Sequence, residues 1–355
     1  MTGSSCIWHG KSVLITGGAG FIGSEIVRSL KKFNPAKITV LDKMTYAADL
    51  QRIDSGKSIV VEEVALEDAE AVLATVTNAK PDYIIHCAAE SHVDRSIDGP
   101  DSFVISNVVG TLNLLQAALK HWCLRGSDSD FRFLHISTDE VYGSLGGEGV
   151  FSERSPYNPR SPYSATKAAS DHLVQAWFHT YGLPIIITNC GNNYGPWQFP
   201  EKLIPLMILA ALDQKPLPLY GNGEQIREWI HVRDHVRGIY AALEMGRVGE
   251  TYLIGSGEEK SNRAVVEEIC GLLDQRFPER GGHNHLISHV EDRPGHDFRY
   301  ALDTEKIQRE TGWHPQVSFN EGLAQTLDWY LDMESWWRPL LNQKNTGARL
   351  GVFKH

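Results

Sequence analysis

The strongest constraint on the fold is an alternation, over the first 190 residues, of short apolar runs with longer amphipathic segments. The apolar runs lack a polar residue at every second position, which is typical of strands whose sheet is covered on both faces. Helices between such strands give parallel pairing with right-handed crossovers. The expected strands span 11–17, 36–42, 58–66, 81–89, 131–138 and 183–190, and the expected helices span 21–33, 67–78, 101–122 and 161–182. The sequence therefore predicts an α/β protein with a doubly wound parallel sheet.

The regular alternation ends near residue 190, and Gly, Pro and aromatic residues become frequent after it. Further helix-like segments span 263–276, 304–312 and 320–332. We expect residues 1–190 to form a nucleotide-binding domain, with a later segment of about 230–258 returning to it. Residues 191–355 then form a smaller α/β C-terminal lobe that holds the substrate.

Composition narrows the classes of partner. The chain has 34 Lys and Arg against 44 Asp and Glu, a net charge of −10, so we expect no general affinity for nucleic acid or for an anionic membrane. The apolar stretch 203–212 is shorter than the ~20 residues that a membrane span needs. The N-terminus lacks the basic and apolar regions of a signal peptide. Five scattered cysteines without a CxxC motif favour a reducing compartment, so a cytoplasmic location is expected.

Histidines at 283, 285 and 289 lie close together in a Gly-rich stretch. Their spacing includes no Cys or acidic ligand, which most protein metal sites of this kind contain. We therefore interpret the stretch as a polar loop leading into a strand, and we expect no metal.

A glycine-rich turn, TGGAGFIG, joins the first expected strand to the first expected helix. Gly17, Gly20 and Gly23 allow a tight turn whose backbone N–H groups approach a pyrophosphate at a helix N-terminus. Asp42 ends the second strand, where an acid accepts a hydrogen bond from an adenosine ribose and favours NAD over NADP. Lys43, next to it, weakens that preference. These features predict a Rossmann-like domain that binds NAD.

The segment YSATK places Tyr163 and Lys167 four residues apart, on one face of an expected helix. A free tyrosine has a pKa of about 10, too high for a base at neutral pH. At ~4 Å and an effective dielectric of ~20, the lysine charge stabilises a phenolate by about 4 kcal/mol, or roughly three pKa units as a ceiling. The pair is therefore a candidate base that takes a proton from a hydroxyl while hydride leaves for NAD.

Two adjacent acids, Asp139 and Glu140, follow Thr138 at the end of the expected strand 131–138. Like charges and burial can separate the pKa values of neighbouring carboxyls, which suits one to act as an acid and the other as a base. An alternative is that the acids only cap the N-terminus of a following helix. The residues alone leave both interpretations open.

An ordered set of motifs makes the chain resemble the extended short-chain dehydrogenase/reductase superfamily, and within it the dTDP-glucose 4,6-dehydratase family. The resemblance runs over about residues 11–350, including a similar tail, GARLG. The motifs are TGGAGFIG, AAESHVDRSI, STDEVYG, YSATK, NNYGP, FPEKLIPL, YGNGEQIREW and DRPGHD.

This resemblance implies a chemical role for each residue at the reaction centre. Tyr163 deprotonates the hydroxyl at sugar carbon 4, Thr138 hydrogen-bonds that oxygen, and hydride passes to NAD. The new ketone acidifies carbon 5, where Glu140 acts as the base. Asp139 donates a proton to the hydroxyl that leaves carbon 6, and hydride returns there. The implied substrate is dTDP-glucose and the implied product is dTDP-4-keto-6-deoxyglucose.

The resemblance also implies the binding residues. Those implied for NAD are Gly17, Gly20, Phe21, Ile22, Gly23, Asp42, Lys43, Thr45, Leu66, Ala88, Ala89, Ser106, Tyr163, Lys167 and Asn193. Those implied for the substrate are Ser91, Thr138, Asn192, Lys202, Leu203, Pro218, Tyr220, Arg227, Asn262, Arg293 and His296. Among the latter, Arg227 and Arg293 suit a diphosphate, because guanidinium groups bind phosphate oxygens bidentately.

Four positions depart from the pattern of this family. Ala65 replaces an Asp that accepts from the adenine amino group, at a cost of ~1.5–3 kcal/mol at most. Gly191 stands where Ser is usual. His231 and Arg233 stand where an aromatic residue and an acid are frequent. These departures leave the nucleotide preference less sharply defined than the reaction.

Other functions remain open at this point. One is a 4,6-dehydratase or 4-epimerase that acts on a UDP- or GDP-sugar. Another, of a different class, is a redox-sensing binding protein that kept the nucleotide turn and lost catalysis. In this superfamily, helices such as 101–122 and 161–182 pair across a two-fold axis, so the resemblance also implies a homodimer.

Overall fold

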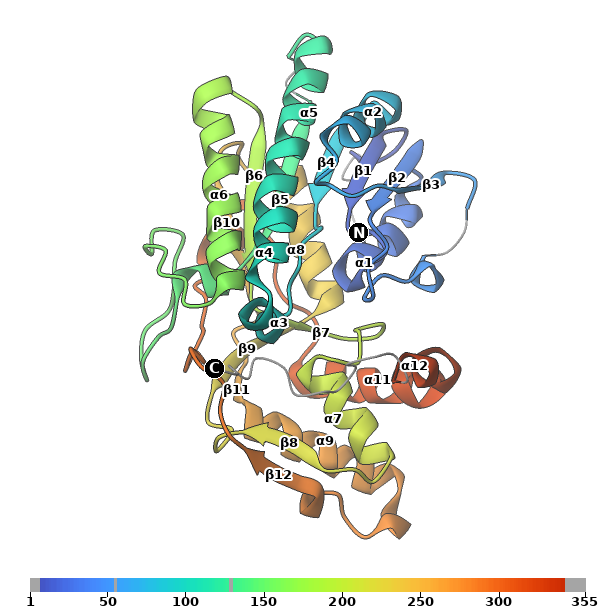
Figure 1. Cartoon of the computed structure of the whole chain (residues 1–355), viewed down its shortest axis with the longest axis vertical. Coiled ribbons are helices and arrows are strands. Elements are labelled where there is room, and N and C mark those ends of the chain that lie inside the picture. Colours follow the sequence, from blue (N-terminus) through green and yellow to red (C-terminus); the bar gives the residue numbers. More distant parts are fainter. Residues whose placement is uncertain (1–6, 54–55, 128–129, 342–355) are drawn as a thin grey trace.

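The computed structural model describes residues 7–53, 56–127 and 130–341, and a seven-stranded sheet forms the body of the molecule (Figure 1). All neighbouring strands are parallel, in the order β10-β6-β5-β4-β1-β2-β3. The strands are β1 (Ser12–Thr16), β2 (Lys37–Asp42), β3 (Ile59–Glu63), β4 (Tyr83–His86), β5 (Arg132–Thr138), β6 (Ile185–Cys190) and β10 (Thr251–Ile254). The predicted doubly wound parallel sheet is confirmed. From β1 the strand order runs one way to β2 and β3 and the other way to β4, β5 and β6, and this switch point opens a crevice at the carboxyl ends of β1 and β4.

Helices cover both faces of this sheet. One face carries α2 (Ala69–Ala79), α5 (Gly110–Leu124) and α6 (Pro162–Tyr181), and the other carries α1 (Phe21–Leu30), α8 (Val232–Met245) and α10 (Glu305–Thr311). The centre of strand β1 is apolar because Val13 and Ile15 pack in the core beneath α1 and α8, while Leu14 packs in the core beneath α2 and α5. Successive strand residues point to opposite faces, and here both faces are buried.

The bounds of α6 follow from its sequence. The Ser161 hydroxyl accepts a hydrogen bond from the Ser164 N–H, and the Ser164 hydroxyl accepts one from the Ser161 N–H, which completes a capping box. Pro162 occupies the first turn, where its missing N–H has no cost. Gly182 ends the helix with φ of 72°. The predicted helix 161–182 is confirmed, and it holds Tyr163 and Lys167 in its first two turns.

The expected helix 101–122 differs from its prediction. It consists of α4 (Pro100–Phe103), a π-helical segment (Val104–Val109) and α5, which follow one another without a break. The resulting helix, Pro100–Leu124, is long and apolar enough by length and composition to cross a membrane, which the shorter apolar stretch 203–212 is not. Half of its most apolar window is buried, and α5 packs against α2 and α6 as a core helix does.

The remaining elements form a second lobe below the sheet in Figure 1. It contains a three-stranded sheet, β11-β9-β7, and a parallel pair, β12-β8. The strands are β7 (Asn192–Tyr194), β8 (Leu217–Tyr220), β9 (Ile226–His231), β11 (Glu259–Ser261) and β12 (Ile287–Val290). The helices are α7 (Leu203–Leu212), α9 (Asn262–Arg276), α11 (Phe319–Asp332) and α12 (Glu334–Leu341). A separate apolar cluster that includes Ile204, Ile269 and Leu327 forms the core of this lobe.

Chain order and spatial position do not coincide after residue 190. Strand β10 pairs with β6, and α8 and α10 lie on the first sheet, although all three follow the start of the second lobe. The division into residues 1–190, with about 230–258 returning, and residues 191–355 is kept as a proposal. The tail motif GARLG lies outside the described residues.

The three clustered histidines point to different partners. His283 Nδ1 lies 2.5 Å from Asp274, while His285 and His289 bond the backbone oxygens of Gly282 and Gly221. Within the described part of the chain, no group of three His, Cys, Asp or Glu side chains is placed to hold a metal ion.

Candidate active site

A cavity of about 360 Å³ lies at the carboxyl ends of β1, β2, β4, β5 and β6, between the sheet and the second lobe. Its walls include every residue that the resemblance implied for NAD and for the reaction centre. Of the implied substrate residues, the cavity is lined by Ser91, Thr138, Asn192, Lys202 and Leu203. The remainder lie outside its lining: Pro218, Tyr220, Arg227, Asn262, Arg293 and His296.

The glycine turn forms a cradle that no other residue type could build. Gly17 has φ of +67°, and a Cβ there would lie 2.7 Å from the Ala88 Cα. A Cβ on Gly23 would lie 2.1 Å from the Gly17 carbonyl oxygen. Helix α1 begins at Phe21, directly after Gly20, so Gly23 lies in its first turn. The backbone is therefore exposed to the cavity at a helix N-terminus, a geometry that binds phosphate oxygens.

Asp42 ends β2 at the rim of the cavity. One carboxylate oxygen accepts a hydrogen bond from the Ala19 N–H and the other from the Met44 N–H, each at 3.0 Å. Burial raises the pKa of Asp42, and these two backbone donors and the Arg52 and Lys43 charges oppose that rise. The backbone thus fixes the carboxylate where the sequence expects a ribose acceptor.

Lys43 is surrounded by acids. Its ammonium lies 3.7 Å from Glu67 and 3.4 Å from Glu90, and it donates to Ser106 Oγ at 3.1 Å. Because both acids neutralise its charge, Lys43 is poorly placed to attract a further anion such as a ribose 2′-phosphate.

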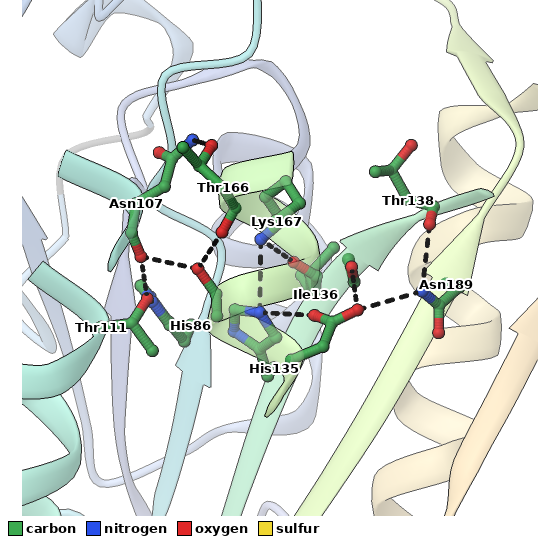
Figure 2. A network of polar contacts seen from close by, with 12 residues as sticks. His86, Asn107, Thr111, His135, Ile136, Thr138, Thr166, Lys167 and Asn189 are labelled. Carbon is green, nitrogen blue, oxygen red and sulfur yellow. Dashed lines mark hydrogen bonds and ion pairs between the residues drawn. The ribbon is translucent and has the colours of Figure 1, made fainter. Parts of the chain in front are cut away.

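Tyr163 and Lys167 lie on the buried face of α6, but their relation differs from the expectation. Lys167 Nζ donates to the Ile136 carbonyl oxygen at 2.8 Å and lies 3.3 Å from His135 Nε2 (Figure 2). Burial and the nearby charge of Glu140 hold the pKa of Tyr163 well above its usual value. The lowering of the Tyr163 pKa by Lys167 stays a prediction, and it has to overcome this effect of burial.

The two acids sit at the end of β5. Thr138 caps the short 3₁₀ turn Asp139–Tyr142 by accepting from the Glu140 N–H at 3.3 Å, and its hydroxyl donates to Asp139 Oδ1 at 3.1 Å. Thr138 therefore supplies the capping hydrogen bond, and both acids lie in the first turn that follows it. Asp139 is 1% exposed, and its Oδ2 has no hydrogen-bond partner among the described residues.

The surroundings separate the two carboxyl groups electrostatically. Burial, then Glu140 and Glu228, hold the pKa of Asp139 well above its usual range. Burial also raises the pKa of Glu140, but the positive charges of Arg293, Arg227 and Lys202 oppose that rise. Asp139 therefore favours the protonated form, and Glu140 is the better placed of the two to be ionised.

The two candidate diphosphate arginines are already engaged. Arg293 Nη1 donates to Asp94 Oδ1 at 2.6 Å, and the Tyr220 hydroxyl donates to the other oxygen of Asp94 at 2.9 Å. Arg227 donates to backbone carbonyl oxygens and stacks 4.5 Å above the Tyr300 ring. Arg227 and Arg293 still act on Glu140 through their charge, although neither lines the cavity.

His296 and Lys202, two further candidates for binding the substrate, each have a partner within the chain. His296 Nδ1 lies 2.6 Å from Asp292, and Lys202 Nζ donates to the Ser91 carbonyl oxygen at 2.9 Å. Lys202 and Ser91 come from different lobes, so this bond closes one wall of the cavity.

Sequence reasoning missed a buried polar network behind the site. Asn107 holds the Glu90 backbone and the Thr166 hydroxyl, while His135 and Asp171 adjoin Lys167 (Figure 2). Asp171 could have been found, because it lies four residues after Lys167 on the same helix face. His135 carried no comparable signal, since it resembles any core residue of a strand.

Two of the departures from the family pattern have a physical explanation. A Cβ at Gly191 would lie 2.8 Å from the Glu228 carbonyl oxygen, so this backbone path excludes a serine. His231 caps α8 by accepting from the Arg233 N–H at 3.3 Å. Ala65 does not line the cavity, whereas the acid Glu67 does.

Comparison with known proteins gives a consistent result. A family model described as GDP-mannose 4,6 dehydratase matches residues 14–326. The dTDP-glucose 4,6-dehydratase of Neisseria meningitidis is 50% identical over 354 residues, covering 97% of this chain and 100% of that protein.

Solved structures agree. The dTDP-glucose 4,6-dehydratase of Streptomyces venezuelae, crystallised with NAD and TYD, is 45% identical with a TM-score of 0.85 over 92% of this chain and 99% of that one. That of Bacillus anthracis, in complex with NAD, is 41% identical with a TM-score of 0.82 over 92% and 99%. The chain therefore belongs to the dTDP-glucose 4,6-dehydratase family of the extended short-chain dehydrogenase/reductase superfamily.

Proposed function

We propose that this chain is a hydro-lyase that converts dTDP-glucose into dTDP-4-keto-6-deoxyglucose with NAD as its cofactor. The observation that carries the proposal is the placement of two buried acids, Asp139 and Glu140, in the same cavity as Tyr163 and the dinucleotide turn. A half-identical relative of nearly equal length is named for this activity.

The residues of the cavity fit NAD. The Gly17–Gly23 turn leaves space and backbone donors for a pyrophosphate, and Asp42 is held in place as a ribose acceptor. When bound, NAD supplies the acceptor for a hydride from carbon 4 of the hexose and the donor that returns it to carbon 6. The paired Lys43 supports NAD over NADP.

Three side chains move protons in this scheme. Tyr163 takes the proton of the carbon-4 hydroxyl, with the Thr138 hydroxyl bonded to the same oxygen and Lys167 supplying positive charge that favours the phenolate. Glu140 removes the proton from carbon 5, which the carbon-4 ketone has made acidic, and gives a proton back to carbon 5 when hydride returns to carbon 6. Asp139, whose pKa burial raises, holds the proton that the leaving hydroxyl at carbon 6 takes up as water.

The alternatives are less well supported. An epimerase needs no second acid–base pair, and a redox sensor needs none of these side chains. The matching family model is named for a GDP-sugar, so a GDP-sugar is the alternative substrate. The nucleobase would contact residues near Leu203 and Tyr220, and these residues do not decide between thymine and guanine.

The test follows the product. Purified protein is incubated with NAD and with dTDP-, UDP- or GDP-glucose, and the alkali-induced absorbance of a 4-keto sugar is measured. We expect product from dTDP-glucose, and its absence with all three substrates would refute the dehydratase.

A single substitution tests the role of Glu140. Glu140→Gln is expected to form the 4-ketone but to stall before water is lost, since general base catalysis at carbon 5 is worth 10²–10⁴-fold. Release of deuterium from substrate labelled at carbon 5 measures this step. A normal rate of release would show that another group is the base.

We further propose that the protein is a homodimer. Val104, Ile105 and Val109 are 47%, 46% and 38% exposed on the π-helical segment, and they form an apolar face beside α6 that a second copy could cover. A cytoplasmic location and the absence of nucleic-acid and membrane partners remain predictions from the sequence.

A further inference from the structure

A buried chain of polar groups runs from Lys167 through His135 to Asp171 (Figure 2). His135 Nε2 is 3.3 Å from Lys167 Nζ and 3.2 Å from Asp171 Oδ1. The imidazole comes from β5, and the lysine and aspartate come from successive turns of α6. All three side chains are buried, at 0%, 4% and 1% exposure for His135, Lys167 and Asp171.

Asp171 is built to stay ionised. Its Oδ2 accepts hydrogen bonds from the Ser137 hydroxyl at 2.7 Å, the Tyr157 hydroxyl at 2.9 Å and Asn189 Nδ2 at 3.4 Å. Burial would raise the pKa of Asp171, but the bond with His135, the charge on Lys167 and these donors hold it below its usual value. A fixed negative charge therefore lies one imidazole away from Lys167.

That charge acts on the lysine. Burial lowers the pKa of Lys167, and Asp171 is the largest of the influences that raise it again. The other titratable groups facing the ammonium are Cys87, which follows β4, Cys190 on β6, and His135; the tilted ring of His86 lies 5.0 Å from that of His135. Burial raises the pKa of the Cys87 thiol to about 12 and also raises that of the Cys190 thiol, so neither is charged at neutral pH.

The imidazole separates the two charges. Burial and the Lys167 charge lower the pKa of His135 to about 4, so the ring is neutral at neutral pH. A single nitrogen, Nε2, faces both charged groups, while Nδ1 has no hydrogen-bond partner in the described part of the chain. One neutral nitrogen cannot donate to Asp171 and accept from Lys167 at the same time. The ring therefore forms a hydrogen bond with one of the two groups and only keeps the other at a distance.

We propose that His135 and Asp171 are positioning residues for Lys167. The carboxylate keeps the buried lysine charged, and the neutral ring prevents the two from forming a direct ion pair that would turn the ammonium away from Tyr163. This inference rests on the proposed function, in which Lys167 favours the phenolate of Tyr163.

The proposal predicts opposite effects of two substitutions on the alkaline limb of the kcat–pH profile, which reports loss of the Lys167 proton. Asp171→Asn removes the negative charge, so the midpoint of the alkaline limb should move about one to two units to lower pH. His135→Ala removes the ring between the two groups and lets Lys167 pair directly with Asp171. The midpoint of the alkaline limb should then move to higher pH, while kcat at its optimum falls about 10- to 100-fold. His135→Gln keeps a neutral, polar spacer and should restore most of that loss.

Ser170→Ala provides a matched control. Ser170 is equally buried on α6, but its hydroxyl bonds only the Asn107 and Thr166 backbone oxygens. This variant should leave the alkaline limb in place. Limbs that stay unmoved in Asp171→Asn and His135→Ala, with reduced rates, would show a purely structural role and overturn the proposal.

A second measurement needs no turnover. In protein labelled with ¹⁵N in its histidine rings, the His135 signal is assigned by its loss in His135→Gln. The signal should report a neutral ring between about pH 5 and about pH 8 and move when Lys167 titrates, at a lower pH in Asp171→Asn than in the unaltered protein. An identical titration in both would overturn the proposal even if the protein has no dehydratase activity, so the two failures are distinguishable.

Discussion

At the scale of single residues, the neighbouring charges separate the roles of two acids that are both buried. Asp139 and Glu140 are adjacent in sequence, yet Asp139 faces other carboxylates while Glu140 faces three cations. Chemically similar side chains therefore take different protonation states from their surroundings. The same burial also places an ionisable group where its charged form is unfavourable, which couples activity to stability.

Asp139→Asn should therefore lose activity and gain stability. The pKa of Asp139 is raised in the folded protein, so its contribution to stability is complete below the unfolded value of about 3.9 and is lost as the pH rises through the folded value. At neutral and alkaline pH the Asn variant does not lose this stability, so it should be more stable than the parent. Its kcat should be about 10²–10⁴-fold lower.

Urea unfolding of both proteins at several pH values checks this expectation. The stability advantage of the variant should grow with pH and should disappear below about pH 4. A variant that is less stable than the parent at every pH would contradict the assignment of Asp139 as a buried, protonated acid.

At the scale of elements, the helix Pro100–Leu124 serves two purposes through its π-helical segment. The wider turn places Ser106 and Asn107 toward the interior, where Asn107 holds the loop at Glu90 and the start of α6. It also leaves Val104, Ile105 and Val109 on the outside. The periodicity of the sequence predicted a helix here but not the π-helical segment. One extra residue in a turn shifts the apolar positions too little to be recognised in the pattern.

Ile105→Glu should convert the proposed dimer into a monomer. A buried, unpaired carboxylate at a two-fold interface appears twice, once from each copy, and leaving a charge desolvated costs several kcal/mol. Size-exclusion chromatography with light scattering measures the change in mass. Leu124→Glu, at a residue 75% exposed at the far end of α5, is the matched control and should remain dimeric.

At the scale of the whole molecule, the end of the described chain returns to the first sheet domain. The indole N–H of Trp336 on α12 donates to Asp49 at 2.7 Å, and the buried Arg52 guanidinium lies 5.3 Å from the same ring. Residues 45, 47 and 48, just before Asp49, line the cavity. The second lobe thereby supports the loop after β2 on which part of the cofactor site depends.

Trp336→Ala should lower the free energy of unfolding by about 3 kcal/mol, because it removes a large ring that is 4% exposed and leaves a cavity. Urea unfolding gives the value. Trp336→Phe keeps most of the ring and loses the bond to Asp49, so its loss should be clearly smaller. Equal losses in the two variants would mean that the hydrogen bond, and not the packing, joins the lobes.

The sequence by itself determined the parallel sheet, the nucleotide turn and the helix that carries Tyr163 and Lys167. These depend on local patterns: apolar strands buried on both faces, glycines where a Cβ would collide, and a helix with Pro162 in its first turn and Gly182 after its last. Patterns of this kind are complete within a few residues, so no tertiary contact is needed to read them.

Only the tertiary structure decided the electrostatics of the site. The raised pKa of Tyr163, the separation of Asp139 from Glu140, and the position of His135 between Lys167 and Asp171 all arise from elements far apart in the chain. The physical reason is desolvation: how strongly a charge is stabilised depends on everything packed around it, and the sequence does not state which strand, helix or lobe that will be.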